Sequence, residues 1–291
     1  MTDQPQASVT ARRMMLGARL RRLREEHGIS RAEAGYTIRA SESKMSRLEL
    51  GRVSFKERDV ADLLMFYGVT DPRQRDSVLA LLREANRPAW WREYEDVLPD
   101  WFQDYIGLEQ AAERIRTYET HFVPGLLQTD DYSRAVIASG LPTPTPVEVD
   151  RAVALRATRK QLLTRTGAPH IWAVLDEAAL RRPVGSEQVR HDQLEHLLKL
   201  ADLSHLTLQV LPLTRSVHAS GSGAFTMLRF SEPDLPDVVY VESLLSALYI
   251  DKPDHVSRYT EVMDRLCVES LSPVATSVFL ADLLTEDRSG R

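Results

Sequence analysis

The fold of the N-terminal part is decided by the segment Ser30-Arg-Ala-Glu-Ala-Gly-Tyr-Thr-Ile-Arg-Ala-Ser-Glu-Ser-Lys-Met-Ser-Arg-Leu-Glu-Leu-Gly51. Ser30 is a suitable cap for a helix that runs to about Ile38, and Glu33, three residues later, completes a capping box. Ser41 caps a second helix, which carries Met45 and ends at the final glycine of the segment. Two short helices joined by a tight turn are typical of a helix-turn-helix unit.

The packing of two such helices needs a small residue in the first helix and apolar residues in the second. Gly35 meets the first requirement, and Met45 and Leu48 follow it by ten and thirteen residues. This spacing fits a helix-turn-helix unit whose second helix projects into a groove of DNA.

The neighbouring sequence extends this unit into a helical bundle. Leu16, Leu20 and Leu23 lie on one helix face before the segment. After it, the apolar stripe Val60–Tyr67 and the stretch Pro72–Asn86, which begins with a favoured first-turn proline, predict two more helices. We therefore expect an all-α domain over residues 1–87, with its core at 14–70.

The charge of the chain is distributed unevenly. The net charge is −5, but residues 1–70 hold 13 lysines and arginines against 9 acids, whereas the remaining residues hold 24 against 33. Six arginines fall within thirteen N-terminal residues that contain no acid: Arg12, Arg13, Arg19, Arg21, Arg22 and Arg24. A basic head on an acidic body favours an approach of the head to phosphate, although a solvated helix face would give the same run of charges.

From Leu16 to Val69 the chain resembles the Cro/repressor-type (XRE) helix-turn-helix family, and Met45–Gly51 resembles the hallmark at the end of its recognition helix. The sequence departs from the family at the corner between the two helices, where Arg39 replaces the usual glycine. A left-handed backbone there would cost a non-glycine residue about 1 kcal/mol.

The resemblance and the geometry of a recognition helix together suggest the DNA contacts. Glu42, Ser43 and Arg47 occupy the positions that resemble the base-contacting ones. Arg47 suits the edge of a guanine, and Glu42 suits the amino group of a cytosine. The expected phosphate contacts, which set register and salt dependence, are Arg31, Lys44, Arg52 and Lys56. The alternative is that these residues are ordinary solvated side chains; for Arg47 the contact with DNA is favoured, and for Glu42 and Lys56 the two interpretations are balanced.

Two further residues match a structural ion pair of the resembling family. Glu49 lies at the inner side of the end of the third helix, and Arg24 matches the first-helix arginine with which its counterpart pairs. The resemblance therefore implies that Arg24 and Glu49 fix the third helix against the first. Breaking such a pair would cost about 3 to 5 kcal/mol if it is buried.

The second half of the chain predicts an α+β domain over residues 101–285, after an aromatic linker at 88–100 and before a disordered tail at 286–291. Leu108–Ile115 begins a helix, and Ile171–Leu175 and Leu206–Val210 are strands on either side of a helix, an order that favours a parallel pair. Ala224–Phe230, Val238–Val241 and Ala247–Ile250 add strands that we expect to be antiparallel. The fold class is therefore multidomain, with a mixed sheet of about five strands in the second domain.

A second resemblance covers most of this region. The segments Tyr105–Glu109, Val123–Thr129, Leu175–Leu180 and Val239–Glu242 look like signatures of an actinobacterial domain of unassigned role that follows such a helix-turn-helix. The resemblance implies a regulator of development or secondary metabolism, encoded beside a small partner protein. It makes Pro124–Thr129 a candidate contact for that partner, although a structural turn between two helices explains the segment equally well.

The chemistry of the second domain gives little reason to expect an enzyme. His191 and His196 do not have metal-ligand spacing, and a carboxylate pair drawn from Asp176, Glu177 and Glu242 is more commonly solvated or capping. We expect no catalytic residues, metal or cofactor. The single cysteine and the lack of a membrane helix or secretory signal predict a cytoplasmic protein associated with the nucleoid.

These observations favour a homodimeric, sequence-specific transcriptional regulator that binds double-stranded DNA and is controlled through its C-terminal domain by a small protein or ligand. The alternative is an antitoxin-like protein-binding module whose DNA binding is mainly autoregulatory. Formation of a complex with the product of a neighbouring gene, dependent on residues 101–291, would distinguish the two.

Overall fold

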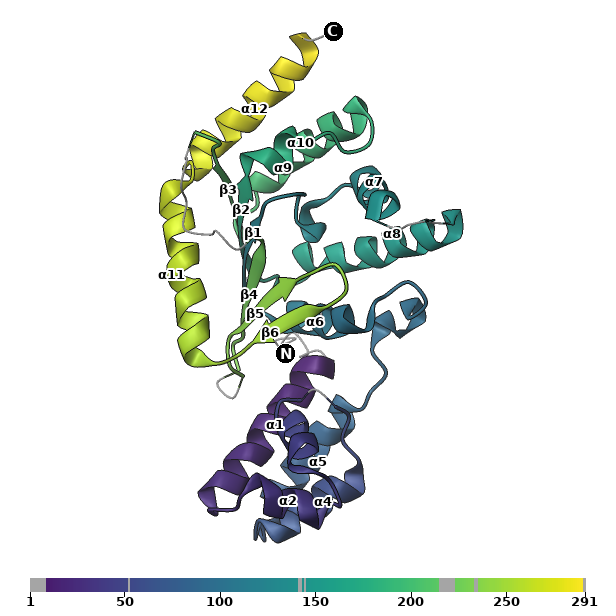
Figure 1. Ribbon diagram of the computed structural model, residues 1–291, viewed down its shortest axis with the longest axis vertical. Coiled ribbons are helices and arrows are strands. Elements are labelled where there is room, and N and C mark those ends of the chain that lie inside the picture. The colour runs from purple at the N-terminus through teal and green to yellow at the C-terminus, as the bar shows by residue number, and fades with distance from the viewer. Residues whose placement is uncertain are drawn as a thin grey trace. The chain divides into compact units, whose positions relative to one another are not determined.

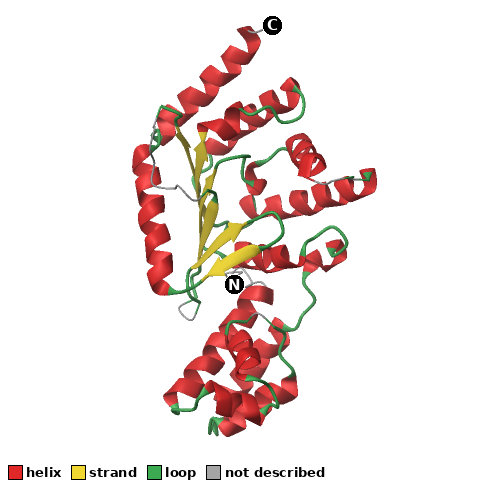
Figure 2. Ribbon diagram, viewed as in Figure 1, coloured by secondary structure: helices red, strands yellow, loops and turns green. Residues whose placement is uncertain are grey.

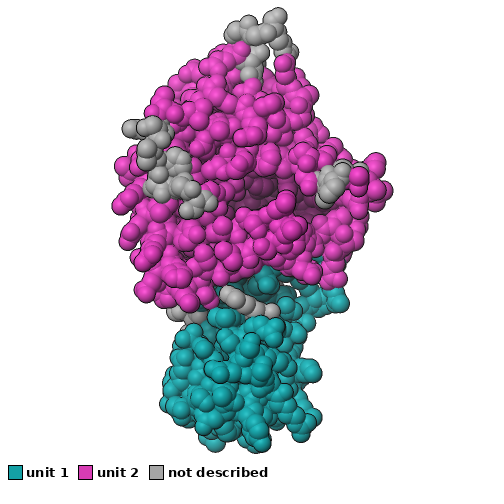
Figure 3. Space-filling view, viewed as in Figure 1, with its two compact units in different colours: residues 1–92, 104–111, 230–236 teal, residues 93–103, 112–229, 237–291 magenta. Residues whose placement is uncertain are grey.

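The computed structural model describes residues 9–51, 53–140, 143, 145–214, 223–232 and 235–289. The chain divides into two compact units, which Figure 3 shows in teal and magenta. Unit 1 consists of residues 1–92, 104–111 and 230–236, and unit 2 consists of residues 93–103, 112–229 and 237–291. The arrangement is the predicted one of a helical N-terminal part followed by an α+β part.

Unit 1 is built from five helices around one apolar core (Figures 1 and 2). They are α1 (Val9–Glu26), α2 (Arg31–Thr37), α3 (Glu42–Glu49), α4 (Glu57–Phe66) and α5 (Pro72–Ala85). The 3-10 helix η1 (Trp90–Tyr94) and helix α6 (Asp100–Ala111) follow, and each has residues in both units. The predicted stripe of Leu16, Leu20 and Leu23 is fully buried in the core. Burial of this stripe supplies the main driving force for docking α1.

The helix ends follow the local signals in the sequence. Ser30 and Glu33 form the predicted capping box, with Ser30 N donating to Glu33 Oε2 over 2.8 Å. Ser41 Oγ accepts a hydrogen bond from the backbone N of Lys44, as predicted for the cap of α3. Gly51, which follows α3, has a φ of 66°, a conformation that favours glycine.

Unit 2 contains a six-stranded sheet with the order β3-β2-β1-β4-β5-β6. The strands are β1 (Arg114–Glu119), β2 (His170–Asp176), β3 (Leu206–Leu211), β4 (Phe225–Arg229), β5 (Val238–Glu242) and β6 (Ala247–Ile250). β1 pairs in parallel with β2, and β2 in parallel with β3, as predicted for the latter pair. The other neighbouring pairs are antiparallel, so the sheet is mixed.

The strand β1 corrects the sequence analysis, which placed Ile115 in a helix. The helix α6 ends at Ala111, and Ile115 lies in β1 at the centre of the sheet, paired with Ile171 on one side and Leu228 on the other. Ile115 continues the helical spacing of the apolar residues before it, so periodicity alone favoured the helix. The two neighbouring strands, which come later in the chain, decide the conformation instead.

The remaining helices of unit 2 cover the two faces of this sheet. They are α7 (Asp130–Gly140), α8 (Pro146–Lys160), α9 (Glu177–Arg181), α10 (Glu187–Ala201), α11 (Pro253–Glu269) and α12 (Pro273–Ser289), with 3-10 turns η2 (Gly125–Leu127) and η3 (Gln161–Leu163). Figure 1 shows α11 along one face of the sheet and α7, α8 and α10 on the other side. Met263 and Leu266 of α11 pack in one core with Tyr118 and Val174 of the sheet.

The helix α12 continues to Ser289, beyond residue 285, at which we expected the domain to end. Residues 290–291 of the predicted tail lie outside the described residues. In the described part of the chain no single helix is long and apolar enough to cross a membrane, although the bent pair Pro253–Glu269 and Pro273–Glu286 meets the length and composition test together. No group of three or more described His, Cys, Asp or Glu side chains is arranged to hold a metal ion.

Candidate DNA-binding site

The helix α3 separates its side chains into a buried and an exposed set. Met45 is fully buried and Leu48 is nearly so, because both pack in the core of unit 1. Glu42, Ser43 and Arg47 are exposed, and their side chains make no hydrogen bond or ion pair with another described residue. The three predicted base contacts are therefore available to a ligand.

The predicted phosphate contacts differ in their surroundings. Lys56 is exposed and caps α4 without a side-chain hydrogen bond, and Lys44 in α3 is partly buried. Arg31 begins α2 and donates from Nε to Glu49 Oε2 over 3.0 Å. Arg52 lies outside the described residues. The structure thus gives Arg31 a protein partner that sequence reasoning did not foresee.

The corner between α2 and α3 has a left-handed backbone even though Arg39 stands where the resembling family has glycine. Arg39 has a φ of 55° and its side chain is exposed. Ala40 N donates to Gly35 O over 2.8 Å, which closes the end of α2. A Cβ atom on Gly35 would lie 2.7 Å from Ala40 O, so the tight corner requires glycine at this position. The corner sets the direction in which α3 leaves α2.

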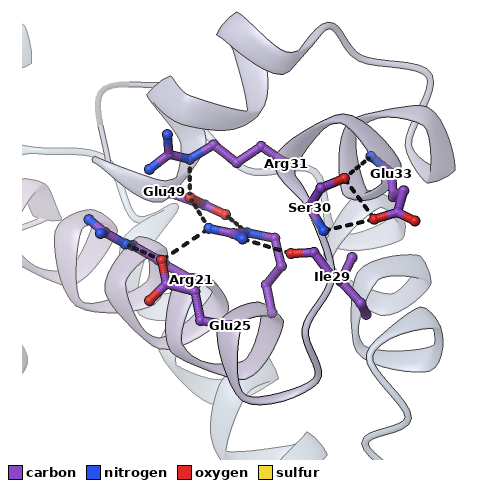
Figure 4. A network of polar contacts seen from close by, with 8 residues as sticks. Arg21, Glu25, Ile29, Ser30, Arg31, Glu33 and Glu49 are labelled. Atoms are coloured by element: carbon purple, nitrogen blue, oxygen red, sulfur yellow. Dashed lines mark hydrogen bonds and ion pairs between the residues drawn. The ribbon is translucent and has the colours of Figure 1, made fainter.

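A buried carboxylate holds the end of α3 against α1 and α2 (Figure 4). The side chain of Glu49 is 2% exposed, and Arg24 of α1 approaches it with Nε 2.5 Å from Oε1 and Nη2 3.1 Å from Oε2. Arg24 also donates from Nη1 to Ile29 O over 2.8 Å. With Arg31 on Oε2, the carboxylate of Glu49 is bound by two arginines from different helices. The pair that the sequence resemblance implied is thus part of a larger network.

The electrostatics of this network favour its ionised form. The hydrogen bond to Glu49 raises the pKa of Arg24, and burial opposes this effect without cancelling it. Tyr67 is fully buried beside the pair, and burial together with the charge of Glu49 raises the pKa of its hydroxyl. The hydrogen bond between Arg24 and Glu49 therefore stabilises the charged form of the Arg24 guanidinium.

Two glycines allow α1 to pack closely against the end of α3, and the sequence analysis gave neither this role. A Cβ atom on Gly17 would lie 2.5 Å from Glu49 O, and one on Gly51 would lie 2.5 Å from Met14 N. Both contacts are with backbone atoms, which cannot move aside cheaply. A glycine within the apolar face of a helix could have indicated this close approach.

The arrangement provides a rigid helix with one polar face directed outward. The buried face of α3 is held by apolar packing, its last residue by two ion pairs and its first turn by the cap at Ser41. An α-helix supported in this way can enter the major groove of DNA and present Arg47 to base edges. Preorganisation of the helix reduces the entropy that would be lost on binding.

The carboxylates that the sequence analysis considered in unit 2 have structural partners. Asp176 Oδ1 accepts from Ala178 N at the start of α9, and Glu177 Oε2 accepts from Leu213 N. Glu242 accepts a hydrogen bond of 2.8 Å from the hydroxyl of Tyr240. Capping and bracing account for the positions of these carboxylates without a catalytic role.

Glu119, at the end of β1, is a titratable residue that the sequence analysis missed. Burial and, to a lesser extent, the charge of Glu242 together raise its pKa to about 8. Its side chain keeps part of its surface accessible, and it makes no hydrogen bond to another described residue. The missed strand explains the omission, because only the sheet brings Glu119 and Glu242 to the same edge.

The segment Pro124–Thr129 forms a tightly held turn in unit 2. Leu127 and Gln128 are almost fully buried. Gln193 of α10 donates to Leu127 O and accepts from Thr129 N, both over 2.8 Å. These contacts favour the structural interpretation of the segment over a role as a contact surface for a partner.

Two family descriptions match the chain. A helix-turn-helix domain matches residues 15–78, and a domain of unknown function (DUF5753) matches residues 102–282. Neither description names a catalytic activity, and the first supports a DNA-binding role for the N-terminal helices. No curated protein and no solved structure matches the chain.

Proposed function

The chain belongs to the DUF5753 domain family, and on this premise we propose that it is a sequence-specific transcriptional regulator whose helix α3 reads DNA. In this proposal residues 1–87, with the core at 14–70, are a DNA-binding domain of the XRE type. Residues 101–285 are the regulatory domain, joined to it by the linker at 88–100. The protein acts in the cytoplasm on the nucleoid and catalyses no reaction.

The observation that carries the proposal is the exposed polar face of α3. Glu42, Ser43 and Arg47 project from a helix whose other side is fixed in the core. Arg47 can donate two hydrogen bonds to the O6 and N7 atoms of a guanine, and Glu42 can accept one from a cytosine amino group. Lys44, Lys56, Arg31 and Arg52 supply the phosphate contacts.

Arg47→Ala tests this assignment most directly. The full chain is first used to select a binding duplex from a random-sequence pool. We expect the variant to lose about 1 to 3 kcal/mol of binding to that duplex and to relax its preference at one base pair of each half-site. Titration of the selected duplex and of its single-base variants would measure both effects.

Arg73→Ala is a matched control, because Arg73 is an exposed arginine of the same charge on α5. It should leave the base preference unchanged. The assignment of α3 to the groove would be wrong if Arg47→Ala discriminated among the base variants as the wild type does.

We further propose that the protein binds as a homodimer to a roughly palindromic operator. Dimeric regulators of this type place their recognition helices in successive major grooves, about 34 Å apart. Selected sequences should therefore contain inverted half-sites with that spacing. Analytical ultracentrifugation with and without the selected duplex would measure the stoichiometry, and a single chain on a single half-site would contradict the proposal.

The proposed control by a small protein partner is supported by an exposed apolar hairpin in unit 2. Leu244 and Leu245, in the turn between β5 and β6, are 88% and 77% exposed, and Leu248 at the start of β6 is 63% exposed. Large apolar side chains grouped on a surface are typical of protein-binding sites. The same surface favours, as the second candidate function, an antitoxin-like module whose DNA binding is mainly autoregulatory.

Co-expression with the protein encoded by the adjacent gene would test the control by a partner. We expect a complex that Leu244→Ser with Leu245→Ser weakens, whereas Val274→Ser, at an exposed valine of α12, leaves it intact. Binding of the complex to many promoters would support a regulator, and binding confined to its own promoter would support the antitoxin-like module. If the two proteins form no complex, control by that partner is excluded.

A further inference from the structure

The side chain of Arg31 lies between a buried carboxylate and the surface of unit 1. Its Nε atom donates to Glu49 Oε2 over 3.0 Å, and the carboxylate it meets is 2% exposed. The side chain of Arg31 itself is 37% exposed. One end of the guanidinium therefore lies at a buried acid of α3, and the rest lies at the surface.

The terminal nitrogens of Arg31 have no partner among the described residues. In Figure 4 a dashed line joins only the Nε atom of Arg31 to Glu49. The nearby acid Glu33 does not compete for them, because its Oε2 atom accepts from both the backbone N and the hydroxyl of Ser30. The four N–H groups on the two terminal nitrogens thus remain for an incoming anion.

Glu49 does not depend on Arg31 alone. Arg24, whose side chain is 6% exposed, binds both carboxylate oxygens of Glu49. An anion that attracts the terminal nitrogens of Arg31 therefore does not leave the buried carboxylate without a cation. Arg31 can hold Glu49 and an anion at the same time.

We propose that Arg31 is a positioning residue, which binds a DNA phosphate with its terminal nitrogens and, through Nε on Glu49, fixes the recognition helix α3 relative to that phosphate. This inference rests on the proposed function, because it needs α3 to be the helix that enters the groove. It adds that one phosphate contact contributes to base discrimination, although phosphate contacts by themselves carry no sequence information.

The conservative variant Arg31→Lys separates the contact with phosphate from the positioning of α3 through Glu49. A lysine retains the charge but ends in a single nitrogen, which cannot hold Glu49 and a phosphate with the fixed fork geometry of a guanidinium. We expect this variant to keep the salt dependence of binding and to lose roughly three- to tenfold in the ratio of affinities for the selected duplex and a random duplex. Arg31→Ala should lose that ratio and also lower the salt slope by about 1.

The matched control is Arg21→Lys. Arg21 donates from Nε to Glu25 Oε1 over 2.9 Å, so the change removes a bond of the same kind that does not involve α3. The experiment measures affinities of the full chain for both duplexes at several salt concentrations. In parallel, NMR of the arginine Nε–H groups follows Arg24 and Arg31, and this second readout does not depend on DNA.

The results distinguish failure of this inference from failure of the proposed function. The positioning role is overturned if Arg31→Lys discriminates between the duplexes as well as the wild type, or if the Nε–H of Arg31 exchanges with solvent as fast as that of Arg21. The phosphate role is overturned if Arg31→Ala leaves the salt slope unchanged. If Arg47→Ala also has no effect on discrimination, the proposed function itself is wrong.

Discussion

The helix-turn-helix of unit 1 and the sheet of unit 2 were specified by the sequence in different ways. The boundaries of α2 and α3 follow from residues within them or next to them, such as Ser30, Ser41 and Gly51. The central strand β1 has no comparable local signal, and its partners β2 and β4 begin more than fifty residues later. Local chemistry therefore revealed the binding helix, whereas the centre of the sheet required long-range pairing.

The largest effect is expected at the buried ion pair between Arg24 of α1 and Glu49 of α3, a contact between residues far apart in the sequence. Arg24→Ala leaves the carboxylate of Glu49 buried with only Arg31 beside it. We expect a loss of about 3 to 5 kcal/mol in the stability of unit 1. Hydrogen exchange of the amides in α1 to α3 would report this loss separately from unit 2.

Arg21→Ala serves as the control, because Arg21 and Glu25 form an exposed pair in the same helix. Exposed pairs of this kind contribute less than about 1 kcal/mol. Equal effects of the two substitutions would show that the Arg24–Glu49 pair does not hold α3 in place.

The sheet is tested at Glu119, through the dependence of stability on pH. The pKa of Glu119 in the folded chain, about 8, lies above its ordinary value, because burial disfavours the ionised carboxyl. The folded state therefore binds more protons than the unfolded state, and stability falls as the pH rises from about 4.5 to about 8. Glu119→Gln should remove this fall. The stability of the variant relative to the wild type should therefore be about 2 kcal/mol greater at pH 9 than at pH 4. This value is smaller than the full pKa shift implies, because the carboxyl is partly accessible.

Hydrogen exchange of the amides in β1 and β2 at both pH values would measure the difference between variant and wild type. Glu242→Gln should remove a smaller part of the fall in stability, since the charge of Glu242 is the lesser cause of the raised pKa of Glu119. A difference that is independent of pH would contradict a raised pKa for Glu119.

The smallest effect is expected at Arg39, in the corner between α2 and α3. Arg39→Gly relieves a left-handed backbone at a residue whose side chain is exposed, so we expect unit 1 to gain about 1 kcal/mol. Arg39→Ala retains the strained conformation and should show no gain. Thermal unfolding of the three proteins would rank them, and a loss of stability in Arg39→Gly would indicate that the arginine side chain has a structural role.

The fold class and the exposed face of α3 could be predicted from the sequence, and the DNA contacts assigned to that face stay a prediction. Glu42, Ser43 and Arg47 could be placed because the helical period fixes which residues lie opposite Met45 and Leu48. The bond between Arg31 and Glu49 could not be predicted, because residues eighteen positions apart meet only when the corner at Arg39 has formed. The raised pKa of Glu119 could not be recognised while its segment was assigned to a helix instead of the strand β1.

The position of β1 in the sheet also has a consequence for synthesis on the ribosome. Its parallel partner ends at Asp176, and its antiparallel partner ends at Arg229, so β1 must wait for more than a hundred further residues before both of its edges are paired. The five helices α1 to α5 end at Ala85 and contain their own apolar core, which can assemble while the ribosome is still translating the sheet. In the nascent chain the helices α1 to α5 would then be folded while the sheet of unit 2 is incomplete. The unpaired edges of β1 would be a target for a chaperone.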